Sequence, residues 1–255
     1  MEAFDDNGIV LSARAYGDSS AVLNILCEHQ GRHAGMLRGA SSSRQRGIRE
    51  PGTRVHARWQ ARLSDHLGNW SLEATRYHAA ELLDQPLRLS GLQAVCSLAD
   101  AALPEREAHA DVYYATEALL DAMEGEFWAA VLVMWEVKLL KSLGFGLDLS
   151  RCAVTGDSAN LTYVSPKSGC AVSAEGAGPY KERLLSLPGF LIGQGMAEPS
   201  DIVAGLRLTG HFLQRHVFDV TNKPLPPARL RFAETYSRFA GPPATVKTSD
   251  DDSAQ

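Results

Sequence analysis

The sequence predicts an α+β protein with two main parts: a strand-rich region over residues 1–82 and a helical region over residues 83–240. Hydrophobic residues up to about residue 80 fall in short runs separated by Gly- and Ser-rich turns, which is typical of strands. After Pro86 they recur at three- and four-residue steps, as on the apolar stripe of a packed helix. With 255 residues, 45% of them hydrophobic, the chain is long enough to bury a sizeable core.

Five strands are predicted in the first region, joined by short turns except between the third and fourth, where a loop spans residues 39–52. Five short strands within about 75 residues predict a small closed barrel. The five-stranded oligonucleotide/oligosaccharide-binding barrel, the OB-fold, is the leading candidate, and binding single strands is a common use of it. The predicted strands cover residues 8–16, 20–27, 32–38, 53–63 and 67–80.

The second region is predicted to be an all-helical domain with one irregular insert, over about residues 145–179. The insert is rich in Gly and Ser, whereas the segments around it have helical periodicity. The final residues, 241–255, contain too little apolar surface to fold and are predicted to be a disordered acidic tail. The predicted helices cover residues 87–103, 109–123, 127–143, 201–220 and 227–239.

A basic block covers residues 31–62, although the whole chain carries a net charge of −5. It contains eight arginines and one acid, Glu50. Arginine grips phosphate bidentately, so we predict nucleic-acid contact, against the alternative of a solvated basic face. The predicted DNA-binding residues are Arg32, Arg38, Arg44, Arg46, Arg49, Arg54, Arg58 and Arg62.

The last third of this block alternates with period 2. Val55, Ala57, Trp59, Ala61 and Leu63 are predicted to face the core, with Arg54, Arg58 and Arg62 facing water on the opposite side. Trp59 is therefore expected to be a core residue rather than a platform for stacking bases.

No catalytic constellation is present. The sequence has no GxGxxG, GxxxxGK[ST], HExxH or GxSxG motif, and its histidines on predicted helices are isolated. The N-terminus has neither a signal peptide nor a long apolar run, and four widely spaced cysteines fit a reducing cytosol. We therefore expect a cytoplasmic, non-enzymatic protein without a cofactor.

Two half-motifs resemble a degenerate zinc ribbon in the irregular insert. Cys152 is followed by Thr155, and Cys170 by Ser173, where a zinc ribbon carries a second cysteine in each pair. Two thiols and two neutral hydroxyls hold zinc poorly, so we expect no bound metal.

Several motifs in order resemble those of the bacterial recombination mediator RecO family, over nearly the whole chain. The departure is the zinc segment, where Thr155 and Ser173 replace the expected cysteines. The matching segments are Gly8–Leu11 (GIVL), Tyr16–Leu23 (YGDSSAVL), Gly31–Ala40 (GRHAGMLRGA), Pro51–Trp59 (PGTRVHARW), the region from Leu143-Gly144-Phe145 to Cys170, and Leu225–Arg229 (LPPAR).

This resemblance implies an OB-fold followed by a helical domain, without catalytic turnover. It also implies binding of single- and double-stranded DNA, annealing of complementary strands, and association with the nucleoid. The implied partners are RecR and the single-stranded-DNA-binding protein SSB. With RecR, proteins of this family load the recombinase RecA onto DNA that SSB coats. An RNA-binding OB module and, less favoured, a metal-dependent nuclease remain the alternatives.

The resemblance further implies that the helical domain receives the acidic, hydrophobic C-terminal tail of SSB. Such a site needs cations beside an apolar surface, because the tail brings both carboxylates and an aromatic residue. The expected partner-binding residues are Lys138, Lys141, Arg215 and Arg229.

Overall fold

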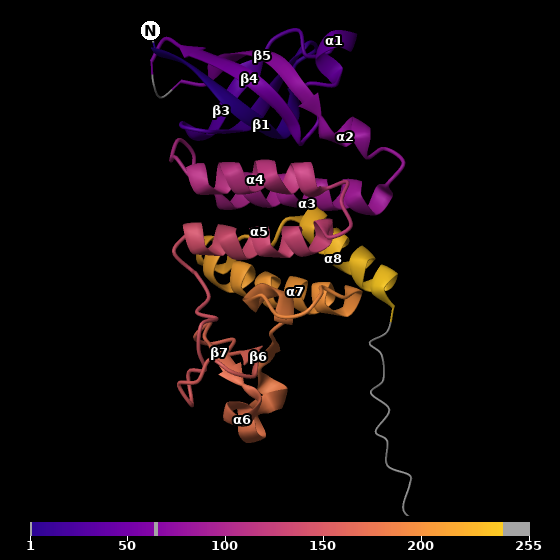
Figure 1. Cartoon of the computed structure of the whole chain (residues 1–255). Coiled ribbons are helices and arrows are strands. Elements are labelled where there is room, and N and C mark those ends of the chain that lie inside the picture. Colours follow the sequence, from indigo (N-terminus) through magenta and orange to yellow (C-terminus); the bar gives the residue numbers. More distant parts are fainter. Residues whose placement is uncertain (1, 64–65, 242–255) are drawn as a thin grey trace, which may run out of the picture.

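The computed structural model describes residues 2–63 and 66–241, apart from the side chains of Ser43 and Arg44 (Figure 1). Its N-terminal region is a closed barrel with the strand order β1-β2-β3-β5-β4. Strands β3 and β5 pair in parallel, the other neighbours pair antiparallel, and helix α1 (Ser43–Arg46) lies between β3 and β4. This arrangement confirms the predicted five-stranded OB-like barrel. The strands are β1 (Glu2–Tyr16), β2 (Ser20–Cys27), β3 (Gly31–Leu37), β4 (Thr53–Ala61) and β5 (Gly68–Tyr77).

Trp59 and Trp70 fill the barrel interior and are nearly inaccessible to solvent. Trp59 donates a hydrogen bond to the Ala34 carbonyl (3.1 Å), so the buried indole leaves no unpaired donor. Gly68 gives this ring its space, since a Cβ there would lie 2.2 Å from the Trp59 ring. The alternation from Val55 to Ala61 is confirmed. The prediction for Leu63 was wrong, because β4 ends at Ala61 and the Leu63 side chain is exposed.

Strand β1 begins six residues earlier than predicted and serves two cores at once. Residues 8–11 are buried on both faces: Val10 points into the barrel, whereas Ile9 and Leu11 pack into the core of the helices. The first residues of β1 were not predicted as strand, because Asp5 and Asp6 interrupt the apolar pattern. The barrel and the helices therefore share a continuous hydrophobic contact.

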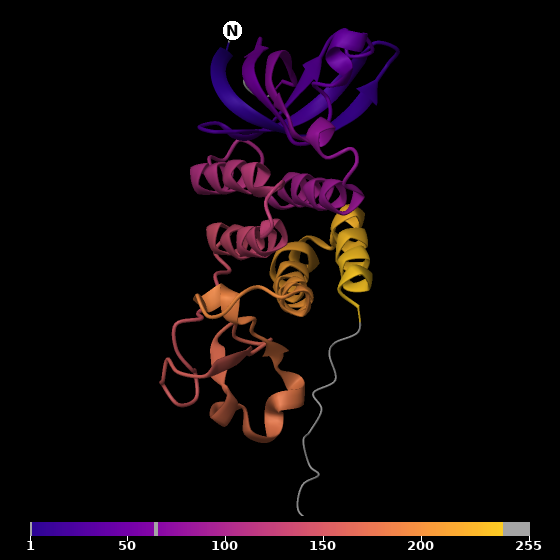
Figure 2. The ribbon, with the colours of Figure 1, turned by 45° about the vertical axis from the view of Figure 1, so that its right-hand side comes forward.

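The helices are stacked below the barrel in layers (Figures 1 and 2). After the short helix α2 (His78–Glu81), α3 and α4 lie against the barrel, and α5, α7 and α8 lie farther from it. All five helices of this stack match the predicted ones to within a few residues at their starts. The helices are α3 (Pro86–Ala102), α4 (Ala110–Ala122), α5 (Trp128–Ser142), α7 (Pro199–Phe212) and α8 (Pro227–Ala240).

The predicted helix over residues 201–220 changes type partway along. Helix α7 ends at Phe212 and continues as a π-helix (Leu213–Phe218) and a 3₁₀ turn (Asp219–Thr221). Hydrophobic periodicity cannot reveal this change, because the side chains stay close to helical spacing.

The insert expected to be irregular contributes β6 and β7 to a three-stranded sheet, β7-β6-β8, which extends to residue 186 and lies at the end of the molecule opposite the barrel (Figure 2). Its strands are too short for a period-2 pattern to stand out. The elements are β6 (Leu161–Val164), β7 (Ala171–Ser173), α6 (Ala174–Ala177), a 3₁₀ helix (Gly178–Arg183), β8 (Leu185–Ser186) and a second 3₁₀ helix (Gly189–Ile192). The predicted acidic tail lies outside the described residues, except for Gly241. No helix in the described part of the chain is long and apolar enough to cross a membrane.

Candidate nucleic-acid interface

Two arginines of the basic block point at the helical region instead of at solvent. Arg32 donates through Nε to the Leu103 carbonyl (2.9 Å), with its Nη1 atom 3.6 Å from Asp100. Arg54 donates to the Glu117 carbonyl (2.7 Å) and forms an ion pair with Asp121 (2.9 Å). The expectation that Arg54 faces water was therefore wrong: α4 covers this end of the β4 face.

Arg76 on β5 extends the same junction, and the basic block alone gave no sign of it. Its guanidinium lies 2.7 Å from Asp121 and 3.0 Å from Glu81. His78 is buried beside this network, and desolvation followed by the charges of Arg76 and Arg54 lowers its pKa to about 4. We refer to these contacts of Arg32, Arg54 and Arg76 with the helices as the domain junction.

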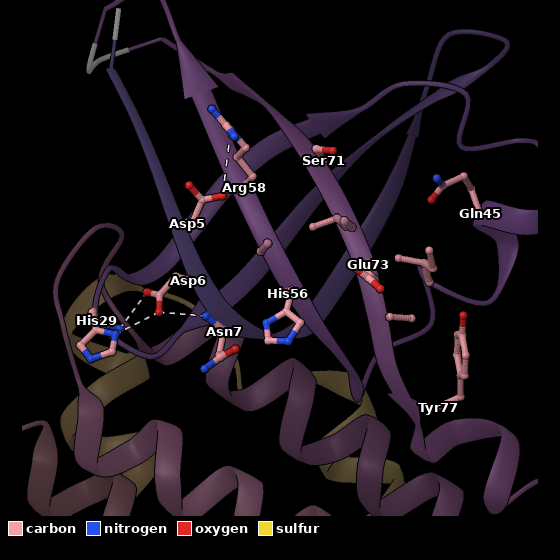
Figure 3. Close-up of a pocket in the computed structure, with 14 residues that line it drawn as sticks. Asp5, Asp6, Asn7, His29, Gln45, His56, Arg58, Ser71, Glu73 and Tyr77 are labelled. Atoms are coloured by element: carbon pink, nitrogen blue, oxygen red, sulfur yellow. Dashed lines mark hydrogen bonds and ion pairs between the residues drawn. The ribbon is translucent and has the colours of Figure 1, made fainter.

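The exposed part of the β4 face has mixed charge. Arg58 faces water, but in the sheet register it lies between Asp5 on β1 and Ser71 on β5, and its Nε is 4.0 Å from the Asp5 carboxylate. His56 is opposite Glu73 in the same way. These side chains line a broad hollow of about 1150 Å³ that reaches α1 (Figure 3). The neighbouring strands supply acids that the sequence of β4 could not reveal.

Two further arginines of the block lie where strands end. Arg38, after β3, donates to the Asn69 side chain (3.1 Å), and Arg62 follows β4, whose Gln60 pairs with Asn69. Both arginines are exposed and lie near the start of β5.

The loop between β3 and β4 contributes the other three arginines of the block. Arg46 on α1 is exposed, whereas Arg49 is half-buried and its Nε has no partner among the described residues. Only the backbone of Arg44 is described, as part of α1. The structure thus separates the eight predicted arginines into two at the domain junction and six on the barrel surface and its loops.

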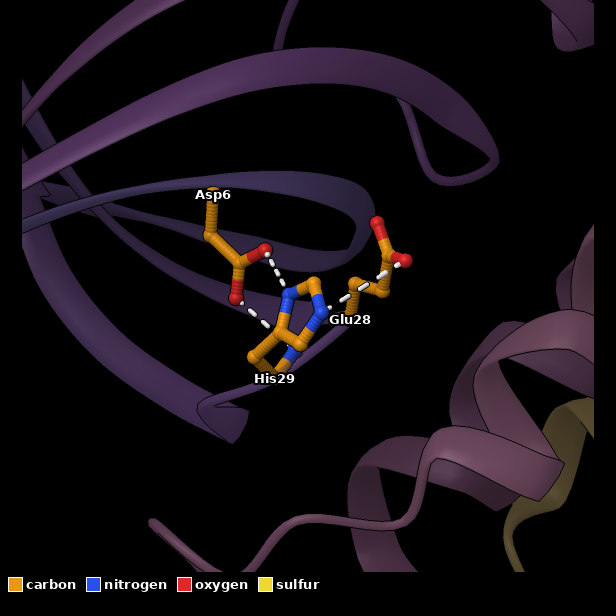
Figure 4. Close-up of side chains that lie close together, drawn as sticks. All are labelled: Asp6, Glu28 and His29. Atoms are coloured by element: carbon orange, nitrogen blue, oxygen red, sulfur yellow. Dashed lines mark hydrogen bonds and ion pairs between the residues drawn. The ribbon is translucent and has the colours of Figure 1, made fainter.

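One group of side chains has the composition of a metal site: Asp6, Glu28 and His29 (Figure 4). The Asp6 carboxylate accepts hydrogen bonds from the backbone N–H groups of His29 (2.9 Å) and Gln30 (3.2 Å) and holds the His29 ring at 3.0 Å. These bonds fix the turn between β2 and β3.

Glu28 in the same group joins the barrel to α4. It accepts a hydrogen bond from Asn7 (3.0 Å) and one from the hydroxyl of Tyr114 on α4. The Tyr114 hydrogen bond lowers the pKa of Glu28, and the bond to Asp6 raises that of His29. The carboxylates thus already accept hydrogen bonds that shape the turn and the junction, and we assign the group a structural role.

The four predicted partner-binding residues do not form one site. Lys138 on α5 pairs with Asp111 on α4 (3.0 Å), and Lys141 is exposed one turn later. Arg215, on the π-helix, is exposed and lies 3.4 Å from the Pro166 carbonyl of the insert.

Arg229 is buried in the centre of the helical region. It pairs with Glu136 through two hydrogen bonds (2.7 and 2.9 Å) and donates to the Leu206 carbonyl (2.7 Å), and Thr209 also donates to Glu136. The expectation that its charged group meets a partner's carboxylate was wrong, because Glu136 already occupies it.

A groove of about 570 Å³ between α7 and α8 combines apolar and charged lining residues, and it was not predicted from the sequence. Leu206, Leu225 and Leu230 are among its apolar lining residues, and exposed Arg207 and Arg238 also line it. Arginine residues on two helices far apart in sequence gave no signal of a common site.

Thr155 and Ser173, one from each zinc half-motif, both contact the sulfur of Cys152. The buried Cys152 Sγ accepts hydrogen bonds from the Ser173 backbone (3.2 Å) and hydroxyl (3.4 Å), and from the Thr155 backbone (3.4 Å). Burial alone would raise the pKa of the Cys152 thiol, but these hydrogen bonds lower it to about 6. Cys170 hydrogen-bonds elsewhere, through Sγ to the Ser168 carbonyl (3.8 Å). Hydroxyl and amide donors thus surround Cys152 where metal ligands would be needed.

The OB-like barrel places the chain in a fold class whose members commonly bind oligonucleotides or oligosaccharides. Comparisons with known proteins show its family over most of the chain. Residues 1–76 match the family described as Recombination protein O N terminal, and residues 83–224 match Recombination protein O C terminal. The chain belongs to the RecO family.

Individual relatives cover nearly the full chain. A protein of Rhodospirillum centenum named DNA repair protein RecO is 49% identical over 91% of this chain and 94% of its own length. Proteins with the same name from Phenylobacterium zucineum and Caulobacter vibrioides are 48% and 46% identical, each over 89% of this chain and 94% of their own lengths.

Proposed function

We propose that this chain is a non-catalytic mediator that binds and anneals single-stranded DNA and helps to load a recombinase onto SSB-coated DNA. Its role in DNA repair follows from the family, whose curated relatives are named DNA repair proteins. The observation that carries the proposed DNA binding is the OB-like barrel with exposed arginines at its strand ends and on α1.

Within the basic block, we propose Arg38, Arg46, Arg58 and Arg62 as the main phosphate contacts. Arg44 and Arg49 flank this set on the β3–β4 loop and remain in the proposal. Arg32 and Arg54 act indirectly, by holding the barrel against the helices. We expect the loop over residues 39–52 to gain protection from proteolysis when an oligonucleotide is added.

The direct test is binding of fluorescent single-stranded, double-stranded and RNA oligomers across a salt series. Replacing Arg38 and Arg62 together by Ala should reduce the slope of log affinity against log salt by about 1.4, because each phosphate contact on a single strand contributes about 0.7. Annealing of complementary strands should slow in parallel. Tighter binding to RNA than to DNA would favour the RNA-binding alternative, and strand cleavage in magnesium would favour the nuclease.

For the SSB tail, we propose docking in the α7–α8 groove. Its apolar lining suits an aromatic residue, and Arg207 and Arg238 suit neighbouring carboxylates. Arg229 shapes the groove without contributing free charge, whereas Lys138, Lys141 and Arg215 lie elsewhere on the helical region.

Charge reversal tests whether the SSB tail binds in the α7–α8 groove or on the surface that carries Lys141 and Arg215. Replacing Arg207 and Arg238 together by Glu should abolish binding of an SSB-tail peptide, and the matched pair Lys141→Glu and Arg215→Glu should leave it unchanged. The opposite result would move the site to the π-helix and the end of α5. RecR binding and nucleoid association in the cytoplasm complete the proposal, tested by co-purification with RecR and by imaging of a tagged chain.

A further inference from the structure

A small cavity of about 160 Å³ opens at the barrel end where β1 begins. Exposed Glu2, Gln30 and Arg106 surround its mouth, and Phe4, His33 and Trp59 form its deeper walls. It is separate from the broad hollow of Figure 3, whose lining residues are different.

The inner walls of the cavity are aromatic. The His33 ring centroid lies 4.6 Å from that of Trp59 and 5.0 Å from that of Phe4, both at steep interplanar angles. Phe4 and Trp59 stack on each other with centroids 5.5 Å apart. A flat ring entering the cavity would therefore meet an aromatic wall, which favours aromatic contact.

His33 is buried, with 5% of its surface exposed, and neither ring nitrogen has a hydrogen-bond partner among the described residues. Desolvation, followed by the charge of Arg106, lowers the pKa of His33 to about 4, so the ring is neutral at pH 7. A neutral imidazole offers one N–H donor and one acceptor. Buried polar groups are normally hydrogen-bonded, so this ring is poised to bind a ligand that carries both functions.

The helical region places a cation at the mouth. The loop between α3 and α4 packs on the start of β3, where the backbone N–H of Arg106 donates to the backbone carbonyl of Arg32 (2.8 Å). A Cβ on Gly31 would lie 1.9 Å from the Glu107 carbonyl oxygen, so only glycine permits this approach.

Arg106 itself has φ +63°, an unusual backbone conformation for a long side chain. Such costly conformations persist where the surrounding structure enforces them, and they cluster at functional sites. Its guanidinium carbon lies 5.8 Å from the centroid of the Trp59 ring, at the entrance of the cavity.

We propose that this cavity binds one pyrimidine base of a DNA single strand, an inference that rests on the proposed DNA-binding function. A cavity of about 150 Å³ in another protein holds one benzene ring, so this one fits a single ring better than a purine. The base edge carries the donors and acceptors that His33, Gln30 and Glu2 can meet. The adjoining phosphates lie outside, near Arg106 and near Arg62, which directly follows Ala61, the β4 partner of Glu2.

The test compares three 12-mers of equal charge: oligo(dT), oligo(dA) and an abasic deoxyribose strand. Wild-type protein should bind oligo(dT) about tenfold more tightly than the abasic strand, in the range expected for contacts to one base, and more tightly than oligo(dA). His33→Phe keeps an aromatic ring at this position and removes both unpaired nitrogens, so it should fold. It should lose most of the preference for oligo(dT) while leaving affinity for the abasic strand within twofold. His211→Phe, in the helical region, is the matched control and should retain the preference.

Photo-crosslinking of wild-type protein to an oligomer containing 5-iododeoxyuridine gives a readout that needs no variant. Attachment to Phe4, His33 or Trp59, found by mass spectrometry, supports the pocket. Crosslinks confined to other residues, or equal affinity for oligo(dT) and the abasic strand, overturn the pocket while leaving the proposed DNA binding intact. Failure to bind any of the three strands overturns both.

Discussion

Arg54 is an arginine of the domain junction, and Arg58 on the same strand, a proposed phosphate contact, is its matched control. Arg54 is 18% exposed and bridges β4 to α4 through the Glu117 carbonyl and Asp121. Hydrogen bonds to charged groups contribute about 1.5–3 kcal/mol when shielded from water. Asp121 keeps its contact with Arg76, so we expect Arg54→Ala to lower the free energy of unfolding by about 2 kcal/mol.

A loss of that size should lower Tm by about 4–8 °C in a chain of this length, measured by differential scanning calorimetry. Arg58→Ala should leave Tm nearly unchanged, because the Arg58 side chain is 55% exposed and its contact with Asp5 is long. In DNA binding we expect the opposite pattern. Arg58→Ala should reduce the slope of log affinity against log salt by about 0.7, and Arg54→Ala should leave that slope unchanged. An Arg54→Ala protein with native Tm and a reduced slope would refute this division.

Four further predictions concern the core, acid stability and the insert. Trp59→Ala should destabilise by about 3–5 kcal/mol, measured by urea unfolding, because it removes a fully buried indole. Arg229→Met should cost about 3–5 kcal/mol by leaving Glu136 buried without its partner, and adding Glu136→Leu should recover most of that loss. His33 and His78 stay neutral in the folded chain, with pKa values near 4, but take up protons near pH 6.5 when it unfolds. Stability should therefore fall as pH drops from about 6.5 to 4, by up to about 3 kcal/mol per histidine, and His33→Phe should remove its share. Metal analysis should find no stoichiometric zinc, and one zinc per chain would contradict our account of Cys152.

The barrel could be predicted because the residue pattern that indicates each strand lies within the sequence of that strand. The alternation of Val55, Ala57 and Trp59 with polar residues reports a strand with one buried face, and that face is buried in the structure. The continuous apolar run at Ile9–Leu11 carries a further local signal, since a strand buried on both faces loses its alternation. Its two faces are divided between the barrel interior and the core of the helices.

The candidate interface was harder to predict because charge pairing depends on neighbours distant in sequence. Nothing near Arg54 indicates that Glu117 and Asp121 will meet it, 63 or more positions later. Asp5 comes to face Arg58 only once the register of β1 and β4 is known. A count of arginines therefore overestimated the exposed positive charge of this region, because Arg32 and Arg54 pair with groups of the helical region.

The distribution of charge also explains how an acidic chain could present the proposed DNA-binding surface. Several acids of α3 and α4 are used at the domain junction, where Asp100, Glu117 and Asp121 neutralise arginines of the barrel. They lie on the side of the barrel that the helices cover, and Arg38, Arg46 and Arg62 remain exposed at strand ends and on the β3–β4 loop. Electrostatic attraction between exposed charges is screened over about 8 Å at physiological salt, so a strand of DNA responds to nearby charges rather than to the net −5. The junction thus fixes the barrel on the helices with one set of arginines while another set stays available to phosphate.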